Sequence, residues 1–495
     1  MRDAFTRSLF ICSLLLLISF FLISTVCADD DVKKVKLRKI SGAYEGSNAV
    51  QTSKDSYVTF CLHGKNKMAP FTLSSVRFTS KAKAYPAKHF FNNIAFNQMI
   101  SGNLPGLSAI GFNDFSASGA GAAADAAGMV LLSTMSSDFT KLITQAVKFD
   151  FKGARMGNNI RLPDITIPGN SLRNINVTAA KGKDSIGIAI AASAFVQNTR
   201  AYVFFMEIDF DGNVIRGPVQ LKLLNSGTRQ MISVGAPFFN GKNWWIPADT
   251  VNTTVKNFVE VATSHSLVVI SATPKNNTYT SKTVKFADDN QETPERTFAG
   301  YQFYSYHKQK KSSPTPSAKP KYYLFYSTRE IIKGPEQTFV PAYYIQETKK
   351  GKTKGNRVEA QIPEWKPKLD TVSALWEVTV LSESFSNIVV TDKGNVLIGI
   401  QRSLETFAGS PAESRKILPG MPKLGLYHNA TWVINNRGEV RFNYEISYDA
   451  NDYAVQDCPP MLNPFIVQDM FLSIFFAQDV SENTYMWMQS KGIKP

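Results

Sequence analysis

The stretches Phe149-Asp150-Phe151-Lys152-Gly153-Ala154 and Ile208-Asp209-Phe210-Asp211-Gly212-Asn213-Val214 follow one plan. In each, an Asp follows an apolar residue and a Gly stands three positions after the Asp. Tight β-hairpin turns need a residue with positive φ, which Gly adopts without a Cβ penalty. Two later stretches are similar: Val390-Thr391-Asp392-Lys393-Gly394-Asn395-Val396 and Ile434-Asn435-Asn436-Arg437-Gly438-Glu439-Val440. We interpret all four as turns that join two strands.

The first two turns belong to a longer internal repeat. Asp150 and Asp209 are 59 residues apart, and Gly182 and Gly241, each followed by a Lys, are separated by the same 59 residues. Runs rich in Val, Ile, Phe, Tyr and Thr stand between these marks, so each unit supplies about four strands. A period of about 40–60 residues with four strands per unit is typical of a β-propeller blade.

The rest of the chain favours the same fold class. Helical periodicity is almost absent, whereas strand-like runs and short turns continue to the C-terminus. Dividing the 495-residue chain, less its leader, by the repeat length gives seven or eight units. We therefore predict an all-β chain, a β-propeller of four-stranded blades over residues 56–495, with seven blades as the best number and six or eight as alternatives.

The N-terminus predicts export. Met1–Arg7 is charged, Leu9–Val26 is apolar, and Cys27-Ala28 precedes an acidic start. This pattern predicts a secretory signal peptide over residues 1–28 and a secreted or extracytoplasmic protein at the cell surface or in a periplasm. The alternatives are an uncleaved membrane anchor and a lipid-bearing Cys27. We expect no membrane span after cleavage.

Two cysteines remain after cleavage, Cys61 and Cys458. An oxidising compartment favours a disulfide between them, and two thiols that never meet are the alternative. A propeller must join its ends, so we predict that the strand Ser56–Leu62 completes the C-terminal blade and brings the two cysteines together. Residues 29–55 are then expected to form a basic extension outside the domain.

Basic residues are clustered in a chain whose formal net charge is +15. Two clusters fall on hairpin tips of successive predicted units, where they are expected to project from one rim and to attract an anionic glycan or a cell-surface protein. Ordinary solvated loops are the alternative, and nucleic acid is not expected as a partner of an exported protein. The proposed rim residues are Lys308, Lys310, Lys311, Lys319, Lys321, Lys349, Lys350, Lys352, Lys354 and Arg357.

Signals for chemistry are weak. Asp209 and Asp211 resemble the start of a calcium loop, but the bidentate Glu of such a loop is missing, so turn chemistry is the better interpretation and no cofactor is expected. No GxSxG motif, HExxH motif or phosphate-cradling Gly loop occurs, and the catalytic residues are unknown. The leading hypothesis is an exported, non-catalytic propeller that binds a partner on one rim.

The rival hypothesis is a propeller-type polysaccharide hydrolase or lyase, which needs two carboxylates at the channel mouth. Asn176, Asn252, Asn276 and Asn429 begin N-x-S/T sequons, about as many as composition gives by chance. The sequence does not identify the ligand, the oligomeric state or the organism. Whether the sequons are glycosylated depends on the organism.

Overall fold

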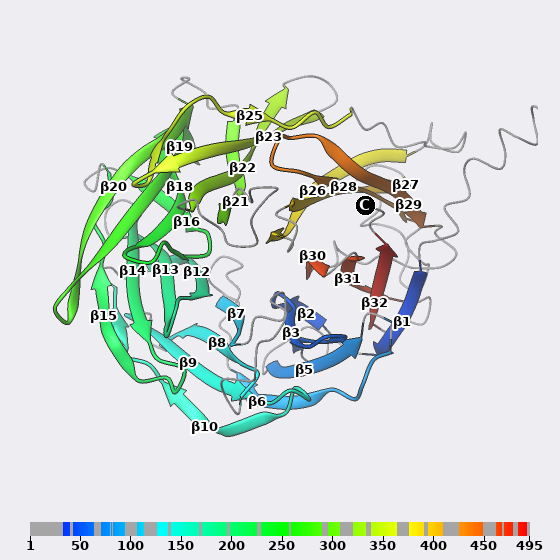
Figure 1. The fold of residues 1–495 in the computed structure, drawn as a ribbon, viewed down its shortest axis with the longest axis horizontal. Coiled ribbons are helices and arrows are strands. Elements are labelled where there is room, and N and C mark those ends of the chain that lie inside the picture. Colours follow the sequence, from blue (N-terminus) through cyan, green and yellow to red (C-terminus); the bar gives the residue numbers. More distant parts are fainter. Residues whose placement is uncertain are drawn as a thin grey trace, which may run out of the picture.

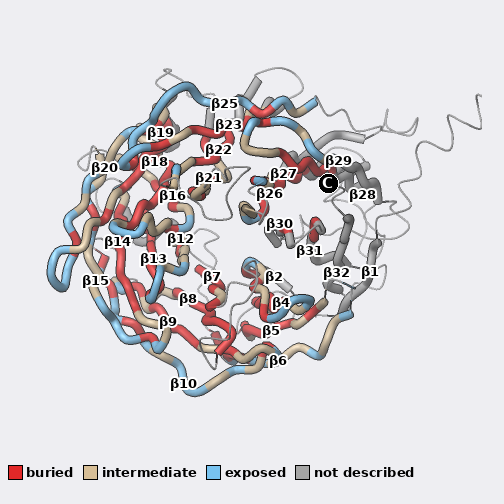
Figure 2. Tube along the Cα trace, viewed as in Figure 1, coloured by how far each residue is buried: buried red, intermediate tan, exposed pale blue. Residues whose placement is uncertain are grey.

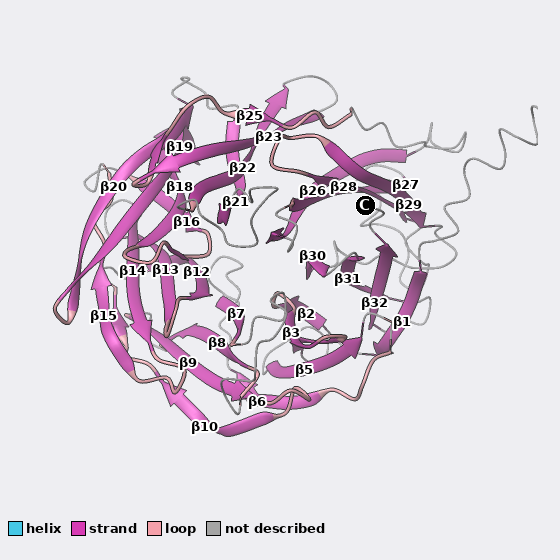
Figure 3. Cartoon of the chain, in the orientation of Figure 1, coloured by secondary structure: helices cyan, strands magenta, loops and turns pink. Residues whose placement is uncertain are grey.

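The structure is a computed structural model, and every element below lies in the residues that it describes. These are residues 33–39, 43–63, 71–79, 81, 83–94, 106–112, 126–136, 140–167, 171–195, 199–224, 229–256, 259–289, 296–306, 320–332, 338–363, 376–390, 395–408, 425–448, 462–467, 470–478 and 484–492. Within them the chain is built of strands and loops without a helix (Figure 3), and so it has no helix that could cross a membrane. The predicted signal peptide, residues 1–28, lies outside these ranges.

The strands form separate antiparallel sheets, named here A to G. Sheet A contains β30 (Leu462–Val467), β31 (Met470–Gln478), β32 (Thr484–Gly492) and β1 (Lys33–Lys39). Sheet B contains β2 (Ala43–Gly46), β4 (Ser56–His63), β5 (Phe71–Thr79) and β6 (Lys88–Ile94), with β3 (Val50–Ser53) also on β4. Sheet C contains β7 (Gly106–Gly111), β8 (Gly128–Met135), β9 (Lys141–Phe149) and β10 (Arg155–Arg161), with β11 (Ile165–Thr166) on β9.

The remaining sheets follow the same plan. Sheet D contains β12 (Ser171–Lys181), β13 (Ile186–Phe195), β14 (Thr199–Ile208) and β15 (Val214–Gln220). Sheet E contains β16 (Gln230–Val234), β18 (Trp244–Lys256), β19 (Val259–Lys275) and β20 (Thr278–Asp289), with β17 (Phe238–Phe239) on β18. Sheet F contains β21 (Arg296–Tyr306), β22 (Lys321–Ile332), β23 (Thr338–Lys349) and β24 (Lys352–Thr353), with β25 (Val358–Glu359) on β23. Sheet G contains β26 (Trp376–Val390), β27 (Val396–Ala408), β28 (Gly425–Ile434) and β29 (Val440–Tyr448).

The sheets stand around a common centre. The strands nearest the centre are β30, β2, β7, β12, β16, β21 and β26, and consecutive sheets lie side by side around the ring (Figure 1). This is a β-propeller with four-stranded antiparallel blades, so the predicted all-β class and blade architecture are confirmed.

The core lies between neighbouring sheets, as the buried segments in Figure 2 indicate. Trp244 and Trp245 are adjacent in β18, and successive side chains of a strand point to opposite faces. Trp244 packs in the cluster shared by sheets D and E, and Trp245 packs in the cluster shared by sheets E and F. Both indoles are buried, at 0% and 2% exposure, because each blade has a neighbour on both sides.

The repeated turns form as the sequence predicts. Asp150, Asp209 and Asn435 each accept hydrogen bonds through Oδ1 from the backbone N–H groups two and four residues later. All three lie between the third and fourth strands of their sheets, and the Gly that follows has a positive φ. The turn around Asp392 lies outside the described residues. The 59-residue interval therefore marks equivalent turns in successive blades, and residues 150–209 run from the β9–β10 turn of sheet C to the β14–β15 turn of sheet D.

The ring closes through the first strand, but that strand is not the predicted one. β1 pairs antiparallel with β32, from Lys33 opposite Ser490 to Lys39 opposite Tyr485. The predicted strand Ser56–Leu62 belongs instead to β4 in sheet B. Residues 29–55, expected to lie outside the domain, supply β1, β2 and β3. The lysines of this segment are compatible with a strand, because an outer edge strand tolerates Lys well.

Cys61 lies in β4 as a buried free cysteine, and burial raises the pKa of its thiol above the ordinary value. β4 is not in the C-terminal sheet, so the strand Ser56–Leu62 does not complete the C-terminal blade as predicted. Cys458 lies outside the described residues, and its disulfide with Cys61 stays a prediction.

Candidate anion-binding site

The candidate site is built on the turn between β23 and β24. Lys349 pairs with Lys352, which leaves Lys350 and Gly351 as a two-residue hairpin loop with φ values of 55° and 79°. Positive φ at both central positions matches the twist of the flanking strands. A Cβ on Gly351 would lie 3.5 Å from Val269 and 4.0 Å from the indole nitrogen of Trp245. The tip thus rests against the neighbouring sheet E.

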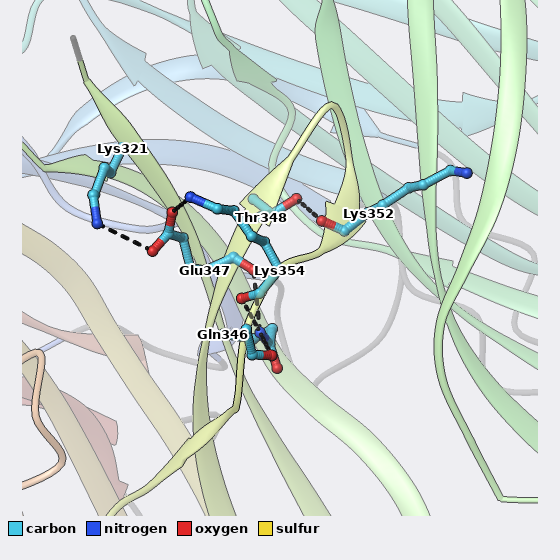
Figure 4. A network of polar contacts seen from close by, with 7 residues as sticks. Lys321, Gln346, Glu347, Thr348, Lys352 and Lys354 are labelled. Carbon is cyan, nitrogen blue, oxygen red and sulfur yellow. Dashed lines mark hydrogen bonds and ion pairs between the residues drawn. The ribbon is translucent and has the colours of Figure 1, made fainter.

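A polar network fixes the backbone below this turn, as Figure 4 shows. Thr348 Oγ1 donates to the carbonyl oxygen of Lys352 at 2.8 Å. Gln346 Nε2 donates to the carbonyl oxygens of Glu347, Lys354 and Gly355 at 3.2, 2.9 and 3.1 Å. The backbone N–H of Lys354 donates to the carbonyl oxygen of Glu347 at 2.8 Å. The charged side chains at the tip therefore project from a fixed backbone.

Glu347 neutralises part of the predicted rim. Its Oε1 lies 2.6 Å from Lys354 Nζ, and its Oε2 lies 3.3 Å from Lys321 Nζ. The hydrogen bond from Lys354, opposed by partial burial and helped by Lys321, lowers the pKa of Glu347. Since both lysines are exposed, these pairs contribute little stability, and their main effect is to offset charge. The sequence prediction of the rim missed Glu347, which stands only two residues before Lys349.

Three lysines remain as the positive part of the tip. Lys349, Lys350 and Lys352 are exposed, and no ion pair is recorded between them and an acidic side chain of the described residues. The Arg357 guanidinium lies 4.2 Å from the centre of the Tyr344 ring, within cation–π distance. The tip thus presents three ammonium groups, with a stacked guanidinium on the same sheet.

The structure corrects the placement of the basic clusters. Both hairpins belong to sheet F, because the chain between β21 and β22 contains the first cluster and the β23–β24 turn contains the second. They were expected in successive units. Tyr322 pairs with Thr348, so the start of β22 and the end of β23 lie at the same end of this sheet. Lys308, Lys310, Lys311 and Lys319 lie outside the described residues, and the other six predicted residues lie within them.

A further lysine lies at the same end of the ring. Tyr322 Oη donates to the carbonyl oxygen of Asn240 at 3.0 Å, which holds the Asn240–Asn243 turn of sheet E against sheet F. Lys242, on that turn, is exposed. In the sequence Lys242 is adjacent to the repeat mark Gly241, and its closeness to the rim depends on how sheets E and F pack.

The weak calcium candidate uses its carboxylates for other contacts. Asp209 accepts from the backbone of Asp211 and Asn213 and from the Asn213 side chain at 2.9 Å. Asp211 forms an ion pair with Lys148 of sheet C at 2.5 Å. Among the described residues, no group of three or more His, Cys, Asp or Glu side chains is arranged to hold a metal ion. The Asp209 carboxylate thus stabilises its own turn, and the Asp211 carboxylate joins sheets C and D.

Buried acidic residues outside the rim also serve contacts between blades. Glu207 accepts hydrogen bonds from Ser185 at 2.5 Å, from Arg216 at 2.6 Å and from Tyr279 of sheet E. Burial opposes ionisation, but these hydrogen bonds prevail and lower the pKa of Glu207. Glu383 of sheet G accepts from Tyr343 of sheet F at 2.5 Å. Each of these carboxylates joins two neighbouring blades.

Comparisons with known proteins show similarity in fold. No protein-family model matches the sequence, and no curated protein matches it. The β-propeller domain of the Trilobed protease from Pyrococcus furiosus is 6% identical, with a TM-score of 0.36 over 92% of this chain and 96% of that chain. The WD40 domain of SCAP from fission yeast is 9% identical, with a TM-score of 0.33 over 94% and 99% of the two chains.

An α-L-arabinanase from Penicillium chrysogenum, solved with arabinobiose, is 10% identical, with a TM-score of 0.38 over 74% of this chain and 94% of that chain. These proteins differ in function. At such TM-scores none of the likenesses carries an argument about what this chain binds.

Proposed function

We propose that this protein is an exported, non-catalytic β-propeller that binds an anionic glycan at the end of sheet F. The observation that supports the proposal most is the exposure of Lys349, Lys350 and Lys352 on a turn whose backbone is fixed by the Gln346 and Thr348 hydrogen bonds. A group of like charges on a rigid support creates a local potential that attracts anions. An acidic cell-surface protein is the alternative partner.

The blade number is part of this proposal. Taking each of the sheets A to G as one blade gives seven, and six and eight are the alternatives. The order of strands supports this number, because each sheet contains one complete path of four strands.

The decisive experiment measures retention on heparin and on a neutral polysaccharide at increasing salt. We expect the protein to bind heparin and not the neutral polysaccharide, and to elute from heparin as added salt screens the exposed charges. The triple variant Lys349→Gln, Lys350→Gln, Lys352→Gln should elute at clearly lower salt. The matched control replaces Lys54, Lys81 and Lys152, which are exposed on sheets B and C, with Gln.

The control has the same net charge as the rim variant, so the two variants separate a local site from overall basicity. Equal shifts in elution for both would overturn the rim. Passage of the unaltered protein through heparin at about 0.15 M salt would overturn anionic glycan binding altogether. The export part is tested separately by N-terminal sequencing of protein from the medium, where a start at Asp29 is expected.

A further inference from the structure

The four sequons occupy different places in the blades. Asn176 lies in β12, where its Oδ1 accepts a hydrogen bond from Val234 N of sheet E at 2.8 Å. Asn252 lies in β18, an inner strand of its sheet, and its Nδ2 donates to Ser264 Oγ at 2.7 Å. Asn429 lies in β28, and its backbone pairs with Ser403 on one side and with Ile446 on the other. These three positions are within sheets.

Asn276 is in a different environment. Lys275 pairs with Thr278, so Asn276 and Asn277 form a two-residue hairpin loop, and Asn276 has a φ of 52°. All three sequon residues, Asn276, Asn277 and Thr278, are exposed. The hydrogen bond recorded for Asn276 uses its main-chain oxygen, which accepts from Arg216 Nε at 3.1 Å. The main chain of Asn276 is therefore held by Arg216, while the residue as a whole is exposed.

An N-linked oligosaccharide is bulky and hydrophilic, and it occupies surface positions. Its attachment uses the side-chain amide nitrogen of Asn. The nitrogen attacks C1 of a lipid-diphosphate-linked sugar and loses one proton, and the lipid diphosphate leaves. At Asn252 that nitrogen is engaged with Ser264 inside the sheet. At Asn176 the attached sugar would interrupt the contact between sheets D and E.

We infer that Asn276 is an N-glycosylation site of this protein and that Asn176 and Asn252 are not occupied in its folded form. The inference rests on the proposed export, because the oligosaccharide is transferred in the secretory pathway of a eukaryotic cell. It assigns a use to the β19–β20 turn that is independent of the lysine rim.

The test expresses the full chain in a eukaryotic secretory host in two forms, one with its own N-terminus and one with a heterologous leader joined at Asp29. The folded protein in the medium is treated with peptide-N-glycosidase, which converts a glycosylated Asn to Asp. We expect a mass increase of about 1 Da, the replacement of an NH₂ by an OH group, at residue 276 and none at 176 or 252.

Two variants serve as a matched pair. Thr278→Val removes the exposed sequon while keeping Asn276 in its turn, and it should reduce the glycosidase-sensitive gel shift by one oligosaccharide without reducing secretion. Thr254→Val removes the Asn252 sequon and should leave the shift unchanged. Secreted protein from the heterologous leader without a modified Asn276, or with a modified Asn176 or Asn252, would overturn the inference. A different result would overturn the proposed export: the form with the heterologous leader is secreted, whereas the form with its own N-terminus stays inside the cell.

Discussion

At the scale of single residues, Asp249 is a buried carboxylate without good hydrogen-bond partners. It is 8% exposed in β18, and its Oδ2 lies 3.5 Å from Nδ1 of the buried His265 in β19. At that distance the contact is too long for a good hydrogen bond. Neither Asp249 Oδ1 nor His265 Nδ1 has a hydrogen-bond partner among the described residues. Burial raises the pKa of Asp249, and the contact with His265 opposes this only in part.

A raised carboxyl pKa means that the folded state holds the proton more tightly than the unfolded state. The contribution of Asp249 to stability is therefore fully present below the unfolded pKa, near 4, and is lost as the pH rises through the folded pKa. We predict that Asp249→Asn raises the free energy of unfolding at pH 7 by about 1–3 kcal/mol, because Asn has no carboxyl group whose ionisation burial opposes. At about pH 4 the gain should be much smaller.

Urea unfolding of the unaltered protein and of Asp249→Asn, each at pH 7 and at about pH 4, measures the difference in unfolding free energy between them. All other titratable groups are the same in the two proteins, so their effects cancel in this difference. Asp211→Asn is the control, since the side chain of Asp211 is 76% exposed. Asp211→Asn should shift the unfolding free energy by less than about 1 kcal/mol, the value of an exposed ion pair. A loss of stability in Asp249→Asn at pH 7 would show that the carboxylate is satisfied in a way the geometry does not reveal.

At the scale of elements, the repeated hairpin turns also dock each blade on its predecessor. A Cβ on Gly212 of sheet D would lie 2.7 Å from Ile160 of sheet C. On Gly438 of sheet G it would lie 2.7 Å from the carbonyl oxygen of Glu359, which belongs to sheet F. The backbone N–H of Gln361 donates to the Gly438 carbonyl at 2.9 Å. Glycine is needed at these two positions because the backbone φ is positive and because the neighbouring blade leaves no room for a Cβ.

The two requirements can be separated by experiment. Gly241 has a φ of +87°, and a Cβ at this position would have nothing within 4 Å, whereas Gly438 has a φ of +74° and a crowded Cβ position. Gly241→Ala should cost about 1–2 kcal/mol of unfolding free energy, the penalty for a left-handed backbone. Gly438→Ala should cost about 1–3 kcal/mol more, because the contact with Glu359 must open. Equal losses in thermal or urea unfolding would contradict the docking role.

These turns were predictable from sequence because Asp or Asn followed by Gly acts through local chemistry. A second repeated device was not predicted, although the chain shows it twice. Asn48 exchanges hydrogen bonds with the backbone of Ala109, at 2.8 and 3.1 Å, and so joins sheet B to sheet C. Asn387 does the same with Ile466, at 3.2 and 2.8 Å, between sheets G and A.

The residue before each of these asparagines is also equivalent. Ser47 Oγ accepts from Phe60 N, and Ser386 Oγ accepts from Gly399 N, in both cases on the next strand of the sheet. The sequence contains both Ser-Asn pairs, but their partners lie on other strands or in another blade. A dipeptide carries no sign of such distant contacts, so this part of the fold needed the structure.

At the scale of the whole molecule, the sequence predicted the blade architecture more reliably than the way the blades are assembled. The repeat interval depends on local turns, and it correctly predicted β-propeller blades. The assignment of both basic hairpins to one sheet depends on which strands pair, and Glu347 shows that a charge count alone does not describe the rim. Closure of the ring depends on pairing between the N-terminal and C-terminal strands, which are far apart in the sequence.

The closing pair β1 and β32 joins residues more than 440 positions apart, and Figure 1 shows the two strands side by side. We predict that a chain starting at Ile40 is less stable than one starting at Val32, because only the first lacks β1. Six residue pairs are lost. With about one backbone hydrogen bond for each pair and about 0.5–1.5 kcal/mol for each bond, the loss should be on the order of 3–9 kcal/mol. Thermal unfolding of the two proteins measures it.

Removal of β1 also leaves the N–H and C=O groups along one side of β32 open, and such an edge pairs with other chains. The chain starting at Ile40 should therefore self-associate in size-exclusion chromatography, while the longer chain should not. Val35→Pro in the full chain provides a second variant without truncation, since Pro has no N–H to donate and Val35 lies opposite Met488 in the register. Its unfolding temperature should fall between those of the two truncations. Identical unfolding and elution of all three proteins would mean that the ring is held by contacts between blade faces, and that the β1–β32 pairing contributes nothing to its closure.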